Sequence, residues 1–288
     1  MKIFDNSKMY PFYFLLGFYF ALKKGLFMLI GIIYFLVIVL ANTIGAISGM
    51  GGGVIIKPVL DLLAKDSVAA ISFYSTVAVF TMSLVSTWRQ VKNGISLNWR
   101  LVAFISAGSI LGGVGGNVVF EGLLLFLADE SLVQLIQITL TIVTLIFALL
   151  YSRFDWKNYH FDSLISYFLS GLVLGFLASL LGIGGGPINV SLLMLLFSFP
   201  IKEATIYSIA TIFFSQLAKI VTIAFGTGFG RYDLTMLFFV VPAAILGGLL
   251  GSRFNHLLAP KKVTLVFQAV IVLVLLINLY NGWQILAK

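Results

Sequence analysis

Two glycine clusters of the same spacing have the composition of an anion site. They read GMGGGV at residues 49–54 and GIGGGP at residues 182–187, and we call them the first and second knots. Each knot interrupts an apolar run. Because glycine costs roughly 1 kcal/mol in a helix interior relative to alanine, we expect one helix to end and another to begin at each knot.

The helix that begins at a knot would present free N–H groups and the positive end of its dipole, which together attract anions. Glycine also lets a ligand approach the backbone without a Cβ in the way. The alternative is that the knots only make tight turns. The glycines predicted to contact the anion are Gly51, Gly52, Gly53, Gly184, Gly185 and Gly186.

A few polar side chains in the apolar segments are candidates to line the same site. Ser75, Ser208 and Gln216 lie on the segments that follow each knot, and Asn189 lies three residues after Gly186. The Asn189 amide could donate to an oxyanion. The alternative for the serines is a hydrogen bond to their own helix backbone, which is common in membrane helices.

Lys57 and Lys219 are the cations that are hardest to place outside the apolar segments. A charge near the centre of a bilayer costs several kcal/mol unless it is paired or hydrated. Either lysine could be the counter-charge of an anion, or could snorkel to the membrane surface. Asp61 follows Lys57 by one helical turn and is positioned to pair with it.

The composition places these residues in a membrane protein. Hydrophobic residues make up 60% of the 288-residue chain and charged residues 10%, against roughly 25% charged in soluble domains. We attribute the formal charge of +8 to cytoplasmic loops rather than to nucleic-acid binding. The chain has no cysteine, and its sequence offers no metal site, cofactor motif or catalytic constellation. We therefore expect a protein that is not an enzyme.

The sequence predicts an all-α, polytopic transmembrane bundle of two repeats, each with four or five helical segments and a helix broken at its knot. The first repeat covers residues 26–152, a charged linker 153–162, and the second repeat 163–288. Residues 1–25 would be an N-terminal interfacial segment. Its apolar run 11–22 is too short to span a bilayer, and either lies on the membrane surface or extends the next helix. The helices are expected at residues 26–48, 54–64, 68–88, 101–120, 132–151, 164–181, 188–199, 204–225, 234–254 and 263–286.

An offset of 133 residues relates the two halves. It superposes the knot glycines, places Tyr74 on Tyr207 and places Phe80 on Phe213. After a two-residue insertion, LGGVGG at 111–116 matches LGGLLG at 246–251. We interpret these last glycines as sites of close helix packing.

The chain resembles the TauE/SafE sulfite exporter family. A helix that ends in a GxGGG knot, then a short helix, then a Ser-containing helix occurs twice, from about residue 26 to 286. The second copy, GFLASLLGIGGGPINVSLL, is close to the family pattern, whereas the first departs from it at Met50 and Lys57. The resemblance implies transport of sulfite or organosulfonates. Where members carry Gly-Thr-Ser, this chain has Phe73-Tyr74-Ser75 and Ile206-Tyr207-Ser208, which puts the particular substrate in doubt.

We therefore expect a multi-pass transporter of the cell (plasma) membrane, a monomer or homodimer, that exports a small sulfur-containing anion held between the repeats. Its partners would be the anion and the lipid bilayer, with no nucleic acid. The alternatives are an importer of organic or sulfur anions, or a membrane subunit that does not transport.

The topology stays open between eight crossings and ten, and ten would make the repeats inverted. The eight-crossing scheme separates the loop cations into two sets. It puts Lys23, Lys24, Arg89, Lys92, Arg100, Arg153, Lys157 and Arg231 inside, and Lys65, Lys202, Arg253, Lys261 and Lys262 outside.

Overall fold

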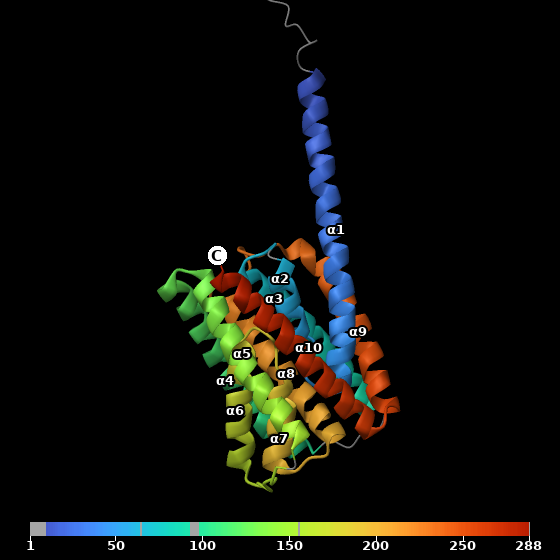
Figure 1. Cartoon of the computed structure of the whole chain (residues 1–288), viewed down its shortest axis with the longest axis vertical. Coiled ribbons are helices and arrows are strands. Elements are labelled where there is room, and N and C mark those ends of the chain that lie inside the picture. The colour runs from blue at the N-terminus through green and yellow to red at the C-terminus, as the bar shows by residue number, and fades with distance from the viewer. Residues whose placement is uncertain (1–9, 64, 93–97, 155, 288) are drawn as a thin grey trace, which may run out of the picture.

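The computed structural model describes residues 10–63, 65–92, 98–154 and 156–287, with side chains from residue 25 onward. The described chain is helical, and Figure 1 shows the helices gathered into one bundle. In the part of the chain that the structure describes, seven helices are long and apolar enough to cross a membrane. The helices are α1 (Tyr10–Ser48), α2 (Gly53–Leu63), α3 (Val68–Lys92), α4 (Trp99–Leu127), α5 (Glu130–Arg153), α6 (Leu164–Leu180), α7 (Pro187–Phe197), α8 (Ile201–Phe225), α9 (Leu237–Leu257) and α10 (Pro260–Leu286).

All ten expected helices are present, with bounds that differ by up to about two turns. One boundary differs more: α1 begins at Tyr10 and continues without a break to Ser48. Residues 11–22 therefore extend the next helix, which was the alternative to a separate interfacial helix. The position of this extension relative to a membrane stays a prediction.

Contacts between loops and helix ends define two ends of the bundle. The Tyr74 hydroxyl in α3 donates to the carbonyl oxygen of Asp233, just before α9, at 3.2 Å. At the opposite end the backbone N–H of Asn98, just before α4, donates to the Tyr207 hydroxyl in α8 at 3.1 Å. We call the end with Asp233 the acidic end and the end with Asn98 the basic end.

At each knot the chain turns back, so the helices before and after the knot form a hairpin. The open side of each hairpin lies at one end of the bundle. The Tyr34 hydroxyl of α1 donates to Asp66, just after α2, so both helices of the first hairpin start or finish at the acidic end. In the second hairpin, the N–H of Tyr159 before α6 donates to the carbonyl of Leu195 in α7 at 2.7 Å, at the basic end.

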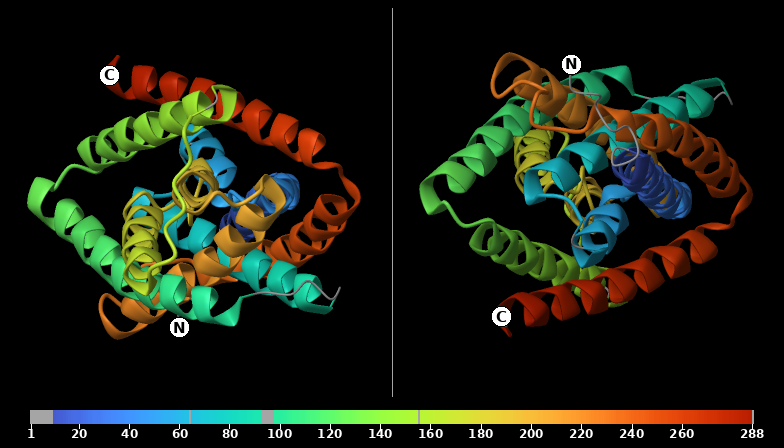
Figure 2. Two further views of the ribbon diagram at one scale, coloured as in Figure 1. Left: turned by 90° about the horizontal axis from the view of Figure 1, so that it is seen from below. Right: turned by 90° about the horizontal axis from the view of Figure 1, so that it is seen from above.

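The topology is therefore neither of the two expected schemes. Six of the described helices (α3, α4, α5, α8, α9 and α10) run from one end of the bundle to the other, and the two hairpins enter from opposite ends (Figure 1). Three end-to-end helices in each half make the halves inverted relative to each other. Seen end-on, α4, α5, α9 and α10 form an outer frame around the hairpins (Figure 2).

The two halves interlock rather than pack as separate bodies. Helix α4 of the first half packs on α6, and α9 of the second half packs on α1. Residues related by the 133-residue offset also meet across the centre, where the Phe80 and Phe213 rings stack with centroids 5.3 Å apart. This arrangement agrees with a duplicated chain.

The expected close-packing glycines lie at these helix crossings. A Cβ on Gly112 would run into the carbonyl oxygen of Leu172 in α6, and a Cβ on Gly251 into that of Thr43 in α1. The small residues let the helix backbones approach closely.

Replacing Gly112 with alanine should destabilise the protein by about 1–3 kcal/mol, because the methyl group overpacks a rigid backbone contact. Gly115, one turn away in α4, is the matched control, since a Cβ there meets only Phe176 Cδ2 at 3.8 Å. Thermal melting in detergent should show a lower midpoint for Gly112→Ala than for Gly115→Ala. Equal midpoints would contradict the packing.

The loop charges divide unevenly between the two ends, and not as the eight-crossing scheme expected. Arg231 lies at the acidic end, where it pairs with Glu121. Lys202 lies at the opposite end, 3.3 Å from the carbonyl oxygen of His256. The basic end carries Arg89, Lys92, Arg100, Arg153, Lys157, Lys202, Arg253, Lys261 and Lys262. The acidic end carries Lys23, Lys24, Lys65 and Arg231 with Asp66, Glu121, Asp129, Glu130 and Asp233.

Because cytoplasmic loops are enriched in Lys and Arg, the basic end should face the cytoplasm. The chain contains no cysteine, so single cysteines can be introduced without further changes. In intact cells a membrane-impermeant maleimide should label Ser131→Cys at the acidic end and leave Ser163→Cys at the basic end unlabelled. The reverse pattern would contradict this orientation.

Candidate functional site

The two knots meet in the centre of the bundle, between the midpoints of α3 and α8. Gly51 has φ +75° and Gly184 has φ +66°, a left-handed conformation that favours glycine. A Cβ on Gly51 would lie 3.3 Å from the carbonyl oxygen of Gly184 and 3.3 Å from Ile212 Cδ1. Both knots therefore line one central region.

The short helices α2 and α7 begin at this centre and run to opposite ends of the bundle. Helix α2 starts at Gly53, and α7 starts at Pro187 with Gly186 as its N-cap. The first N–H groups of a helix generally lack an acceptor within the helix. Here Ile55 and Ile56 donate to the Gly52 carbonyl, Asn189 donates to the Gly186 carbonyl at 3.0 Å, and Pro187 has no N–H, so the remaining donors are the N–H groups of the knots themselves and of the first turn. Two positive helix ends therefore face each other at the knots, as the sequence predicted.

Three of the predicted side chains lie at the knots with buried atoms that lack a partner in the described structure. The Ser75 hydroxyl, both polar atoms of the Asn189 amide and Oε1 of Gln216 accept or donate no hydrogen bond. Ser75 Oγ is 2.8 Å from a Cβ built on Gly53, and Asn189 Nδ2 is 3.4 Å from one built on Gly185. Buried polar groups are normally paired with protein or ordered water, so these atoms have hydrogen-bonding capacity left for a water molecule or a ligand.

Ser208 is different, because its hydroxyl is already used. Ser208 Oγ donates to the carbonyl oxygen of Gly49 at 2.6 Å and so holds the start of the first knot. Ser208 is thus placed to position the knot rather than to contact a ligand, and its symmetry mate Ser75 is the serine with a free hydroxyl.

The sequence analysis missed Asn42, which lies in α1 against the first knot. Its Nδ2 donates to the carbonyl of Ala78 at 3.3 Å, while Oδ1 has no partner and stands where a Cβ on Gly52 would be. Burying an asparagine inside an otherwise apolar membrane helix costs free energy. The presence of Asn42 in such a helix was therefore the feature of the sequence that could have identified it as a candidate.

Lys57 does not reach the membrane surface. Its Nζ lies 2.8 Å from Asp61 Oδ2, and the two side chains are only 4% and 3% exposed. The Lys57 stem borders the second knot, since its Cδ is 3.5 Å from a Cβ built on Gly182. The snorkelling alternative is therefore wrong for this residue.

Lys219 is also buried, on the acidic side of the second knot. Its Nζ donates to Ser72 Oγ at 2.9 Å and to the carbonyl oxygen of Ser179 at 2.8 Å. Ser179 belongs to the last turn of α6, so the ammonium neutralises the negative end of that helix. Ser72 lies between the Lys219 ammonium group and the second knot, so Lys219 does not contact the knot directly.

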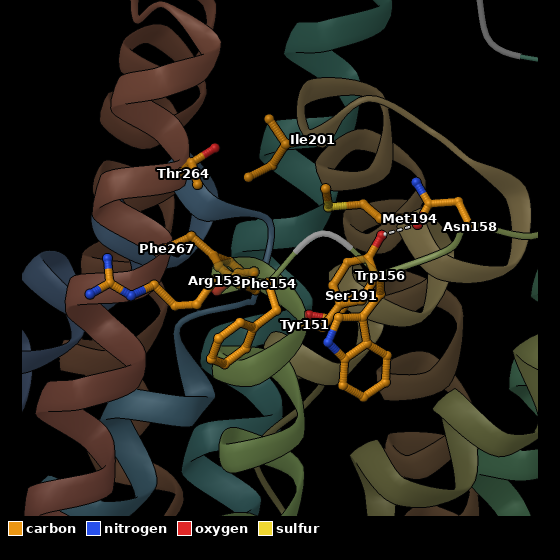
Figure 3. Close-up of a pocket in the computed structure, with 11 residues that line it drawn as sticks. Tyr151, Arg153, Phe154, Trp156, Asn158, Ser191, Met194, Ile201, Thr264 and Phe267 are labelled. Atoms are coloured by element: carbon orange, nitrogen blue, oxygen red, sulfur yellow. Dashed lines mark hydrogen bonds between the residues drawn. The ribbon is translucent and has the colours of Figure 1, made fainter.

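A pocket at each end of the bundle adjoins one of the short helices. The basic-end pocket, of about 240 Å³, is lined by α5, α7, α8, α10 and the linker. Figure 3 shows the Tyr151–Asn158 hydrogen bond and Ser191 on one side of it and the Arg153 guanidinium on the other. The acidic-end pocket, of about 180 Å³, is lined by α2, α3 and α5 and includes Asp61.

Interlocked inverted halves, helices broken in the centre and a pocket at each end define a membrane transporter. The model of the family "Sulfite exporter TauE/SafE" matches residues 34–278, and the chain belongs to this family. It is a multi-pass membrane protein and not an enzyme. In the described part of the chain, no group of three or more His, Cys, Asp or Glu residues is placed to hold a metal ion.

Two curated relatives cover almost the same length. The chain is 27% identical over 263 residues to the "Probable membrane transporter protein YunE" of Bacillus subtilis, covering 84% of this chain and 95% of the relative. It is 24% identical over 270 residues to the "Probable membrane transporter protein MJ0441" of Methanocaldococcus jannaschii, covering 89% and 95% respectively. No solved structure matches the chain significantly.

Proposed function

We propose that this protein exports a small sulfur oxyanion, sulfite or an organosulfonate, which binds between the two knots. The observation that carries the proposal is the meeting of two helix N-termini with unpartnered polar side chains at one buried place. Hydrogen bonds to a charged group contribute about 1.5–3 kcal/mol each. A few such bonds from backbone N–H groups and the Asn189 amide are enough for micromolar to millimolar affinity.

The arrangement favours an anion over a cation. Both short helices turn their positive ends to the centre, and Lys57 lies one turn into α2. A tetrahedral or pyramidal oxyanion has several acceptor oxygens, which match donors that arrive from both knots. The family description names sulfite, which fits this chemistry.

Export is the direction that the membrane potential favours. An inside-negative potential drives each negative charge outward with about 2.3 kcal/mol per 100 mV. Inverted halves allow the site to open first toward one end and then toward the other. The anion would enter through the basic-end pocket and leave through the acidic-end pocket.

Flux into proteoliposomes tests the proposal. Vesicles preloaded with unlabelled sulfite should take up labelled sulfite by counterflow, and competition by sulfate, sulfoacetate and chloride should rank the substrates. Asn189→Ala should lower this flux at least about tenfold, as expected for one lost charge-assisted hydrogen bond. The control is Asn278→Ala, a buried asparagine in α10 that bonds only the carbonyl of Val274.

Absence of saturable flux for every anion in the panel would overturn the carrier proposal. Equal loss of flux in Asn189→Ala and Asn278→Ala would remove Asn189 from the site. Flux that runs inward against the potential would favour the importer.

A further inference from the structure

The buried ion pair of Lys57 and Asp61 is not required by the architecture of the hairpin. The second hairpin has the same shape, and the 133-residue offset places Val190 and Met194 at the equivalent positions. Replacement of a buried ion pair by apolar residues is often neutral or stabilising. A buried pair in one hairpin alone therefore calls for a functional reason.

Asp61 has an oxygen that is free to take up a proton. Oδ2 accepts from Lys57, but Oδ1 is buried and has no hydrogen-bond partner among the described residues. Asp61 lines the acidic-end pocket together with Asp66, Glu130, Ser131 and Gln134. The pocket gives protons a route to this carboxylate from the solution at that end.

The charged and titratable groups around Asp61 come from α1, α3, α5 and the loop after α2, and the α3 group is Tyr74, whose ring centroid lies 6.2 Å from that of Tyr34. Asp66 accepts from the Tyr34 hydroxyl of α1, and Glu130 of α5 accepts from the N–H of Val68 at 3.0 Å. Helix α10 contributes the neutral Asn281, which donates to the carbonyl of Pro58. Two further carboxylates therefore lie at the same pocket as Asp61.

Lys57 links this pocket to the anion site. Its ammonium group bonds Asp61, and its stem borders Gly182 of the second knot. The second buried cation, Lys219, is held by Ser72 and the end of α6, so its charge is already engaged. A proton added to Asp61 would break the ion pair and release the Lys57 ammonium group.

We propose that Asp61 takes up one proton from the acidic-end pocket when an anion binds at the knots, which frees the Lys57 ammonium to face the anion. The proton forms an O–H bond on the Asp61 carboxyl group, and Lys57 stays protonated. When Asp61 loses the proton to the pocket, the ion pair forms again and the anion loses its counter-charge. Because the proton comes from the acidic-end pocket and returns to it, the proton does not cross the membrane, and the anion crosses with its own full charge, which the potential drives outward.

The proposal rests on the anion site at the knots and makes a separate prediction. Because linkage is reciprocal, an anion that promotes protonation must bind more tightly when the pH is lower. The affinity of wild-type protein should fall by up to about tenfold for each unit by which the pH rises. Methanesulfonate is a suitable probe, because its own charge does not change over this range.

The test measures heat of binding and proton uptake together. Methanesulfonate, sulfite and chloride are titrated into detergent-purified protein in weak buffer that contains a pH indicator. Wild-type protein should take up close to one proton for each methanesulfonate bound. Asp61→Asn, which resembles the protonated residue, should bind without proton uptake and with an affinity that is independent of pH.

The double variant Lys57→Val with Asp61→Met places the equivalent residues of the second hairpin at these two positions. It controls for a loss of binding that is caused by misfolding. It should melt close to wild-type protein, bind the anion more weakly and take up no proton. Wild-type binding without proton uptake, or uptake that persists in Asp61→Asn, would overturn the coupling and leave the anion site standing. No binding of any of the three anions would overturn both the site and the coupling.

Discussion

Replacing Gly184 with alanine should reduce anion transport to less than about one tenth of the wild-type rate while the protein still folds. Gly184 has φ +66°, and a Cβ there would lie 2.8 Å from Val79 Cγ1 and 3.2 Å from Gln216 Cδ. The knot would have to shift, and its N–H groups would no longer point toward the anion. Each charge-assisted hydrogen bond lost costs about 1.5–3 kcal/mol, which corresponds to roughly tenfold or more in affinity.

Gly228 provides the control for backbone strain. It has φ +70°, close to the value at Gly184, but a Cβ there meets nothing within 4 Å. Gly228→Ala therefore carries the same conformational penalty outside the site, and it should transport normally. Counterflow of labelled sulfite measures both variants. Normal transport by Gly184→Ala would show that the second knot is not the anion site.

Replacing Lys57 alone with valine should destabilise the protein by about 3–5 kcal/mol, because a buried carboxylate is left without its partner. The Asp61 side chain is only 3% exposed, so loss of the ammonium group leaves a largely buried charge without its partner. Addition of Asp61→Met should restore most of the stability, since the double variant repeats the apolar pair found in α7. Thermal melting of purified protein in detergent measures both effects.

The recovery in the double variant is the decisive comparison. A double variant no more stable than Lys57→Val would show that the two hairpins pack differently around these positions. A single variant that melts like wild-type protein would show that the pair is not buried in solution.

The helices and the knots were predictable from the sequence because they depend on local chemistry. An apolar run of about 20 residues forms a membrane helix, and several consecutive glycines break it. The 133-residue offset also predicted that Phe80 and Phe213 are equivalent, and the structure places these rings against each other. Local composition was enough for each of these conclusions.

The direction of the chain after each knot could not be predicted. Residues 26–64 are apolar enough to suggest one broken crossing, and hydropathy does not distinguish a helix that continues from one that turns back. The hydrogen bond between Tyr34 and Asp66 shows the return, and it joins residues that are distant in the sequence. As a result, the eight-crossing scheme assigned five described loop cations to the wrong ends: Lys202, Arg231, Arg253, Lys261 and Lys262.

The sequence predicted which polar residues lie near the knots but not which of them form hydrogen bonds. Ser75 and Ser208 are equivalent in the sequence, yet Ser208 Oγ donates to Gly49, whereas Ser75 Oγ has no hydrogen-bond partner among the described residues. Spacing placed Asp61 one turn after Lys57, but the burial of the pair depends on α1, α3 and α10, which pack on α2. Hydrogen-bond partners from distant segments decide which polar atoms stay free.

The most direct test of the anion site is the position of a bound selenite ion. Selenite is the larger homologue of sulfite, its selenium scatters anomalously, and the chain has no cysteine that would reduce it. Crystals of the protein with selenite should show one anomalous peak between the two knots, within hydrogen-bonding distance of the Asn189 amide. A peak confined to the basic-end pocket beside Arg153, or no peak at concentrations that saturate transport, would contradict the account.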